Sequence, residues 1–244
     1  SKIIDQIVPI HLRGKNNEWT ALAKRARVIF FNKNKYTYEE LKNLNYEDLS
    51  SPQWRNKIAI RSSNNLYNQS LVASMIAKYG ENYTETWAKG LVSNFSRKPQ
   101  GNDRAQIIAV ANNETDLAIA NSYYLGLMLS GKKGEKQLSA GKKVGILFPS
   151  QNKNGAHINI SGAGILKTSQ NYDNAIKFLE FMLSEEAQKH LVENTYEYPI
   201  NTRVQPSELI SQFGLNFKED STDVSKFGEL NSAALRLMDR VGWQ

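Results

Sequence analysis

Short apolar runs and helical stripes alternate along the chain, a pattern typical of α/β proteins. Five apolar runs have the length of a strand and are bounded by polar or turn-forming residues. They lie at residues 27–32, 57–60, 116–120, 144–148 and 157–160. The sequence therefore predicts a sheet whose strands are connected largely by helices.

Apolar residues recur at helical spacing in most of the segments between these runs. The stripe that begins at Leu71 ends near Tyr79, where Gly80 supplies a stop signal. Further helices are predicted at residues 84–91, 107–111, 123–129, 171–194, 206–213 and 232–240. The longest has Asp173 as its expected cap. Its expected buried face consists of Ile176, Leu179, Leu183, Ala187 and Leu191. The glycine- and lysine-rich residues 130–143 are expected to form a surface hairpin or the tip of a lobe.

The composition is that of a folded globular chain, with 244 residues of which 40% are hydrophobic and 23% charged. This length is enough for one large domain or two smaller lobes. Cysteine is absent, which excludes disulfides, thiolate metal sites and cysteine nucleophiles. The net charge of +7 is spread out, and its densest lysine cluster, at residues 132–143, contains no aromatic residue. We therefore expect a solvated surface there and no nucleic-acid partner.

Several motifs that carry known chemistry are incomplete in this sequence. Residues 162–167 begin like a dinucleotide-binding loop, but Lys167 stands where a third glycine is needed. The histidines His11, His157 and His190 are too far apart in sequence to indicate a metal cluster by themselves. No nucleophile-elbow sequence is present. An enzyme on an α/β scaffold stays an alternative, but it would need an acid–base pair that the sequence does not reveal.

Tyr123 and Tyr124 stand out among the 11 tyrosines because they directly follow a predicted buried strand. At a strand-to-helix junction both phenols can face the same space, and Asn121 or Ser122 can cap the helix. Open α/β sheets bind ligands at the carboxyl ends of their strands, and a helix N-terminus favours negative charge. Phenolate oxygen is a hard donor that suits Fe(III), and a bound cation deprotonates its ligands. The spacing alone leaves open whether the pair is a ferric site or part of the core.

Six segments of the chain match a known family. They are residues 19–28, 61–67, 121–124, 155–164, 184–188 and 196–199. The tyrosine pair combined with the segment His157-x-Asn159-x-Ser161-Gly162 is fairly specific. On these residues the sequence resembles the periplasmic ferric-iron-binding proteins of ABC transporters, most closely the FutA type. The resemblance covers essentially the whole chain.

The resemblance implies a two-lobe periplasmic-binding-protein fold of type II. In this fold crossover strands join two α/β lobes, and the ligand lies in the cleft between them. Residues 1–32 and 156–244 are expected to form the first lobe and residues 33–155 the second. The resemblance further implies a monomeric periplasmic receptor, not an enzyme, which closes on Fe(III) and delivers it to a permease in the inner membrane.

The resemblance also implies the site residues. Tyr123 and Tyr124 match the paired tyrosine ligands, and Tyr67 matches a further tyrosine of the FutA type. Arg27, at the start of the first crossover strand, matches an arginine that points into the cleft and could hold an anion. The residues near positions that bind a companion anion or water are Ser63, Asn102 and Asn121. As alternatives, Arg27 forms only a salt bridge across the hinge and Tyr67 only caps its helix.

The chain departs from the family at its start. Members of the family carry a further stretch before this point, with the first strands of the first lobe and another iron ligand, a tyrosine in the FutA type. We therefore expect an incomplete first lobe, partnered by a missing N-terminal segment, in a chain that is processed or a piece of something longer. Such a lobe exposes a sheet edge and core side chains unless that segment covers them.

A binding protein of the same architecture for an oxyanion or a small organic anion is the alternative function. The net charge of +7 and the presence of Arg27 fit such a ligand. In that case the paired tyrosines would only form a wall of the cleft.

Overall fold

The computed structural model describes residues 1–214 and 216–244, and across these residues it has the predicted α/β character. The strands are β1 (Thr20–Asn32), β2 (Ile58–Ala59), β3 (Leu117–Asn121), β4 (Val144–Leu147), β5 (Ile158–Ala163) and β6 (Tyr198–Pro199). The α-helices are α1 (Lys2–Ile7), α2 (Tyr38–Leu41), α3 (Leu66–Tyr79), α4 (Glu81–Ser93), α5 (Asp103–Ala111), α6 (Tyr123–Leu129), α7 (Glu135–Lys143), α8 (Tyr172–Met182), α9 (Glu185–Thr195), α10 (Glu208–Ser211), α11 (Ser225–Glu229) and α12 (Asn231–Arg240). Short 3-10 helices lie at Ile10–Leu12, Glu47–Ser50 and Pro52–Trp54. No described helix is both long and apolar enough to cross a membrane.

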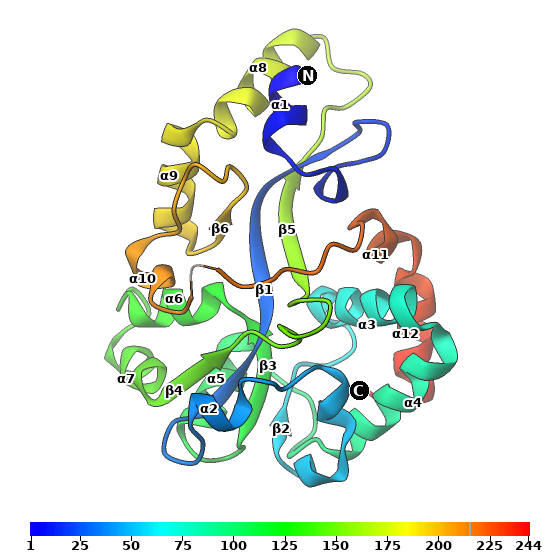
Figure 1. The fold of residues 1–244 in the computed structure, drawn as a ribbon, viewed down its shortest axis with the longest axis vertical. Coiled ribbons are helices and arrows are strands. Elements are labelled where there is room, and N and C mark those ends of the chain that lie inside the picture. Colours follow the sequence, from blue (N-terminus) through cyan, green and yellow to red (C-terminus); the bar gives the residue numbers. More distant parts are fainter. Residues whose placement is uncertain (215) are drawn as a thin grey trace.

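One long strand, β1, runs through both halves of the molecule (Figure 1). Its residues 20–26 pair with β5, and residues 23 and 24 also pair with β6. Its residues 27–32 pair with β3 and β4 in a second sheet. Arg27 therefore lies in the middle of β1, where the strand changes partners, and its predicted place at the start of the strand is wrong. Residues 20–26 escape prediction because small and charged side chains interrupt any apolar run there.

The second part of β1 lies inside a mixed sheet with the strand order β2–β3–β1–β4. Strands β2 and β3 are parallel to each other, whereas β1 is antiparallel to β3 and β4. Ile29 and Phe31 face a core shared with α3, α4 and α12, while Val28 and Phe30 face a core shared with α5, α6 and α7. This alternation follows from the two-residue period of a strand, and it gives the sheet a helical layer on each face.

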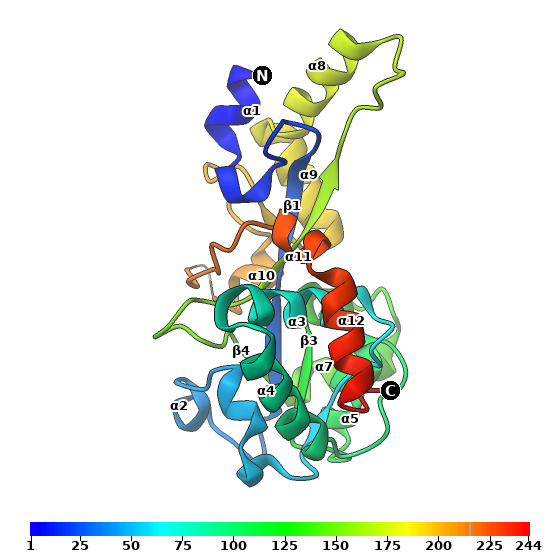
Figure 2. The same cartoon turned by 90° about the vertical axis from the view of Figure 1, so that its right-hand side faces the viewer.

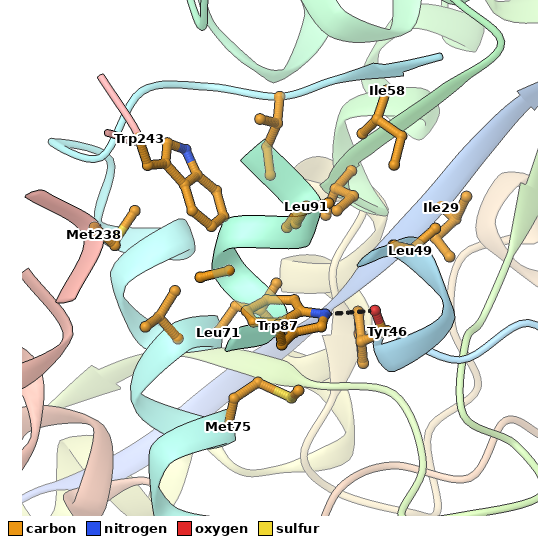
Figure 3. Close-up of a cluster of buried hydrophobic side chains, with 14 of the residues drawn as sticks. Ile29, Tyr46, Leu49, Ile58, Leu71, Met75, Trp87, Leu91, Met238 and Trp243 are labelled. Carbon is orange, nitrogen blue, oxygen red and sulfur yellow. Dashed lines mark hydrogen bonds between the residues drawn. The ribbon is translucent and has the colours of Figure 1, made fainter. Parts of the chain in front are cut away.

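The C-terminal helices pack on α3, and α12 also contacts α4. Trp243 and Met238 join Leu71 and Trp87 in one buried cluster (Figure 3). The indole nitrogen of Trp87 donates a hydrogen bond to the carbonyl of Tyr46 at 2.8 Å. The predicted lobe boundaries stay a prediction; they assign α11 and α12 to the first lobe, although both helices pack on residues assigned to the second.

The half of the molecule that contains α1, α8 and α9 is the smaller one and lies at one end of the long axis (Figures 1 and 2). Its core includes Ile4, Leu12, Ile158 and Leu183. The large apolar side chains that remain exposed in this half are Ile3, Ile10, Leu166, Tyr172, Phe178 and Phe181. These side chains give this half of the molecule exposed apolar surface, while the expected missing segment stays a prediction.

The predicted helix at residues 171–194 is wrong in one respect, because it breaks into α8 and α9. Ser184 caps α9 by accepting a hydrogen bond from the Ala187 amide, and Asn201 donates to the carbonyl of Leu183 at 2.9 Å. These bonds satisfy the polar backbone groups at the break. The cap position of α8 is Asn171, whereas the predicted cap, Asp173, lies in the first turn.

Of the two forms expected for residues 130–143, a surface hairpin or the tip of a lobe, the hairpin is wrong, since α7 begins at Glu135. Ala140 and Gly141 are buried. A side chain at Gly141 would meet Leu129 and Leu125 of α6 within 3.4 Å, so the glycine allows the two helices to pack closely. Because most residues of α7 are polar and its buried face is narrow, too few apolar residues recur in this segment to reveal a helical period.

Candidate metal centre

Tyr67, Tyr123 and Tyr124 come together at one edge of the mixed sheet. Tyr123 and Tyr124 open α6 directly after β3 ends at Asn121. Tyr67 is the second residue of α3, which follows β2 after a short turn. Because β2 and β3 are parallel neighbours, their carboxyl ends lie at the same edge, and both helices begin there. The topology thus brings together tyrosines that are far apart in sequence.

The three rings share one polar environment. The ring centroids of Tyr123 and Tyr124 are 4.1 Å apart, with 31° between the ring planes. The guanidinium carbon of Arg25 lies 5.4 Å from the ring centre of Tyr67 and 5.8 Å from that of Tyr123. A single cation therefore spans rings from both helices. The two phenols of the pair share one space, as predicted for a strand-to-helix junction.

The tyrosine pair is protonated at neutral pH. Burial is the largest cause that raises the pKa of Tyr123, and the neighbouring phenols of Tyr124 and Tyr67 raise it further. Burial also raises the pKa of Tyr124, where the charge of Asp103 acts in the same direction and that of Arg61 opposes it. A cation that binds these oxygens must therefore displace protons from them.

Arg27 lies close to the Tyr67 ring, with its guanidinium carbon 5.9 Å from the ring centre, and it is fully buried. Its Nη1 donates to Asp103 at 2.7 Å and to Asn121 at 3.2 Å, and its Nη2 donates to Asn68 at 2.6 Å. Asp103 also accepts a hydrogen bond from the backbone N–H of Asn121 at 2.8 Å. The charge of Arg27 is thus balanced inside the protein by Asp103 at the start of α5, which packs on the sheet that contains Arg27.

The three other predicted site residues differ in exposure. Asn121 is buried, and its side-chain nitrogen has no hydrogen-bond partner among the described residues. Asn102 is exposed and caps α5 by accepting a hydrogen bond from the Ala105 amide at 3.1 Å. Ser63 is half-buried in the turn before α3, where its carbonyl accepts from Gln69. Asn102 and Ser63 are therefore the more exposed of the three residues, whereas Asn121 is enclosed.

The start of α6 is held in an unexpected way. Ser122 occupies the cap position, but its hydroxyl accepts a hydrogen bond from the Ala26 amide of β1 at 3.2 Å. The side-chain oxygen of Asn121 is bound to Arg27. The prediction that one of these side chains caps α6 is therefore wrong, because both are used to fasten the junction to β1.

Arg25, Asp103 and Glu197 are site residues that the sequence reading missed. Arg25 donates to Ser161 at 2.6 Å and forms an ion pair with Glu197 at 3.1 Å, which leaves 13% of its side chain exposed. It lies two residues before Arg27, hence on the same face of β1, and no sequence pattern separates the two arginines. Asp103 carries a weak signal, since it directly follows the helix cap Asn102.

Carboxylates and histidines do not assemble into a metal site in the part of the chain that the structure describes. There, no group of three or more His, Asp or Glu side chains is placed to hold a metal ion. The tyrosines are the oxygen donors that this geometry gathers.

Sequence comparison relates the chain to a family of transport receptors. A family model described as bacterial extracellular solute-binding protein matches residues 2–217. Iron uptake protein A1 of Synechocystis sp. is 46% identical over 244 residues, which are 100% of this chain and 67% of that protein. The chain thus spans about two thirds of the length of this relative.

Solved structures agree with this relationship. A Trichodesmium FutA structure in complex with iron and citrate ligands has a TM-score of 0.96 and 48% identity, covering 100% of this chain and 76% of that one. The ferric binding protein from Campylobacter jejuni has a TM-score of 0.91 and 42% identity, with the same coverage. The predicted type II periplasmic-binding-protein fold and the resemblance to FutA-type proteins are confirmed. The chain belongs to the family of bacterial extracellular solute-binding proteins.

Proposed function

We propose that this chain binds ferric iron as the cargo of an ABC-type importer, with the phenolates of Tyr67, Tyr123 and Tyr124 as ligands. The observation that carries the proposal is the meeting of these phenols at the ends of two parallel strands. Three phenolates neutralise the charge of Fe(III), and their hard oxygens suit this ion. The names of the relatives, an iron uptake protein and a FutA structure with iron, support the same cargo.

The two arginines of β1 have different parts in this proposal. Arg25 lies over the rings of Tyr67 and Tyr123, so it is placed to stabilise negative charge when the phenols lose their protons. Arg27 is neutralised by Asp103 and supports the site from inside the protein. We assign contact with a companion anion or water to Ser63 and Asn102, because they are the more exposed residues. The citrate in the Trichodesmium structure supports such a companion.

The architecture fits a receptor that closes around its cargo. Because β1 belongs to both sheets, a small rotation about the segment near Arg27 would move one half of the molecule relative to the other. We propose that the closed form acts as a monomer in the periplasm and presents iron to a permease in the inner membrane. Membership of an extracellular solute-binding family supports this location.

A ferric titration followed by visible absorbance tests the assignment, because phenolate-to-iron charge transfer colours the complex. We expect a visible band for the parent protein, a weaker band for each of Tyr123→Phe and Tyr124→Phe, and its loss in the double variant. Tyr83→Phe is the matched control, since Tyr83 is exposed on α4 beside Tyr79. An unchanged band in the double variant refutes the proposal. Binding of phosphate or citrate without any binding of iron would support the anion receptor instead.

A further inference from the structure

A buried chain of hydrogen bonds joins β5 to the helix that carries Tyr67. His157, directly before β5, is fully buried, and Asn159 within β5 is 8% exposed. The Nε2 atom of His157 lies 3.0 Å from the hydroxyl oxygen of Ser70 in α3, and Asn159 donates to the same oxygen at 2.6 Å. The Ser70 hydroxyl donates to the carbonyl of Tyr67 at 3.1 Å. The chain therefore ends on the backbone of a proposed iron ligand.

The number of available protons fixes the direction of these bonds. Ser70 has one hydroxyl proton, which it donates to Tyr67, so it accepts from both Asn159 and His157. His157 is then neutral with its proton on Nε2, and its buried Nδ1, which has no partner among the described residues, is a bare acceptor. Burial lowers the pKa of His157 to about 3, which agrees with a neutral ring.

The backbone of His157 is hydrogen-bonded to Arg27, where β1 changes partners, and to Tyr46. Its amide donates to the hydroxyl of Tyr46 at 3.0 Å, and its carbonyl accepts from the amide of Arg27 at 2.8 Å. The Tyr46 hydroxyl in turn donates to the carbonyl of Arg27 at 2.5 Å. On the other side, the ring of His157 packs against Phe227 with 4.8 Å between ring centroids. These contacts make His157 a fixed point between the two sheets.

The first turn of α3 lacks the usual support at its start. Asn65 stands at the cap position, but its side chain makes no capping hydrogen bond. Asparagine at this position normally stabilises the turn that follows it. This turn is held instead by Asn68, which accepts a hydrogen bond from Arg27 at 2.6 Å, and by Gln69, which donates to the carbonyl of Ser63 at 2.9 Å. Ser70, three residues after Tyr67 in the same helix, adds the contact of this part of α3 with His157 and Asn159.

We propose that His157, Asn159 and Ser70 form a hinge relay, which positions Tyr67 relative to the Tyr123–Tyr124 pair. This inference rests on the proposed ferric function and adds His157 to it as a positioning residue. A metal ligand must be held within about 0.5 Å of its productive place, so a rigid contact behind it raises affinity without touching the metal. The relay also connects the geometry of the hinge to the geometry of the site.

The test compares His157→Met with His157→Gln in ferric binding measured by competition against excess citrate. The glutamine amide can replace the Nε2 donor, whereas methionine has a comparable size and no donor. Loss of an outer partner of a metal ligand weakens metal affinity roughly 10- to 100-fold. We expect such a loss, with a reduced charge-transfer band, for His157→Met, and recovery of most of the affinity for His157→Gln.

A double-mutant cycle with Tyr67→Phe separates positioning from a general structural effect. If His157 acts through Tyr67, His157→Met has no further effect on ferric affinity once Tyr67 is phenylalanine. An equally large effect of His157→Met in both backgrounds overturns the relay, even if the parent protein binds ferric iron. Absence of ferric binding by the parent protein overturns both proposals.

Urea unfolding of the iron-free variants accompanies the cycle. Reduced ferric affinity at an unchanged unfolding midpoint supports positioning. If His157→Met does not fold, Ser70→Ala replaces it in the same cycle, because it removes the relay from the side of α3.

Discussion

Iron binding at the tyrosine pair should release protons, and fewer protons should be released when a tyrosine of the pair is removed. Burial raises the pKa of both Tyr123 and Tyr124 above the usual value for phenols, which is about 10. At pH 7 each phenol is therefore at least three pH units below its pKa. Deprotonation then costs at least about 4 kcal/mol per phenol, or about 8 kcal/mol for the pair, at 1.36 kcal/mol per unit. Coordination to Fe(III) has to supply this free energy.

The sign of the pH dependence follows from these raised pKa values. Below the pKa of a ligand phenol, each unit of added acidity weakens binding by a factor of about ten for every proton that the metal displaces. The affinity for ferric iron should therefore rise with pH over the range 6 to 8. The two phenols of the pair should contribute about two logarithmic units of affinity for each pH unit.

Proton release can be counted in a pH-stat at pH 7. Ferric nitrilotriacetate is added to weakly buffered protein, and the base needed to hold the pH is recorded for each iron taken up. We expect Tyr123→Phe and Tyr124→Phe each to release one proton fewer than the parent protein. The protons taken up by the free chelator cancel in this difference, and Tyr83→Phe serves as the control. Equal release by the parent and both variants at matched iron occupancy would refute phenolate coordination by the pair.

Two further substitutions test how the site is supported. Asp103→Asn leaves the buried guanidinium of Arg27 without its carboxylate partner. This substitution should lower the free energy of unfolding by about 3–5 kcal/mol, seen as a lower midpoint of urea unfolding. An unchanged midpoint contradicts the argument that the ion pair stabilises the fold. Gly126→Ala places a Cβ atom 2.7 Å from the Cβ of Tyr196, so it should destabilise the protein by about 1–3 kcal/mol and reduce ferric affinity by moving α6. Gly228→Ala, where nothing lies within 4 Å of the added atom, is its control; equal thermal midpoints for the two variants would show that the contact at α6 relaxes freely.

The local part of the site could be predicted from the sequence. A buried strand followed at once by a helix, with two tyrosines at the junction, is a short-range pattern, and the structure places Tyr123 and Tyr124 together there. Tyr67 carries no such local signal, and only the family resemblance indicated it. Its place beside the pair depends on the parallel pairing of β2 with β3, a long-range contact that the spacing of apolar residues does not encode.

The capping of α6 shows a different limit of sequence reasoning. Asn121 and Ser122 are residues that commonly cap helices, so local propensity predicts that one of them caps α6. In the structure their side chains bind Arg27 and the Ala26 amide instead. The long-range contacts with β1 outweigh the local preference because they satisfy a buried charge and a buried backbone group, whose desolvation would cost more than one missing cap.

Arg25 and Arg27 show why burial, and not residue type, decides what a charged side chain does in this protein. Both point to the same face of β1, but the strand changes sheets between Ala26 and Arg27. Arg27 therefore enters the interior, where Asp103 and two amide side chains compensate its charge, and it is unable to respond to a ligand without breaking that network. Arg25 stays partly exposed beside the phenols, and it is held by Glu197, which directly precedes β6 in the same sheet as Arg25. A change in the angle between the sheets would thus move Arg25 relative to the tyrosines, while Arg27 stays with them.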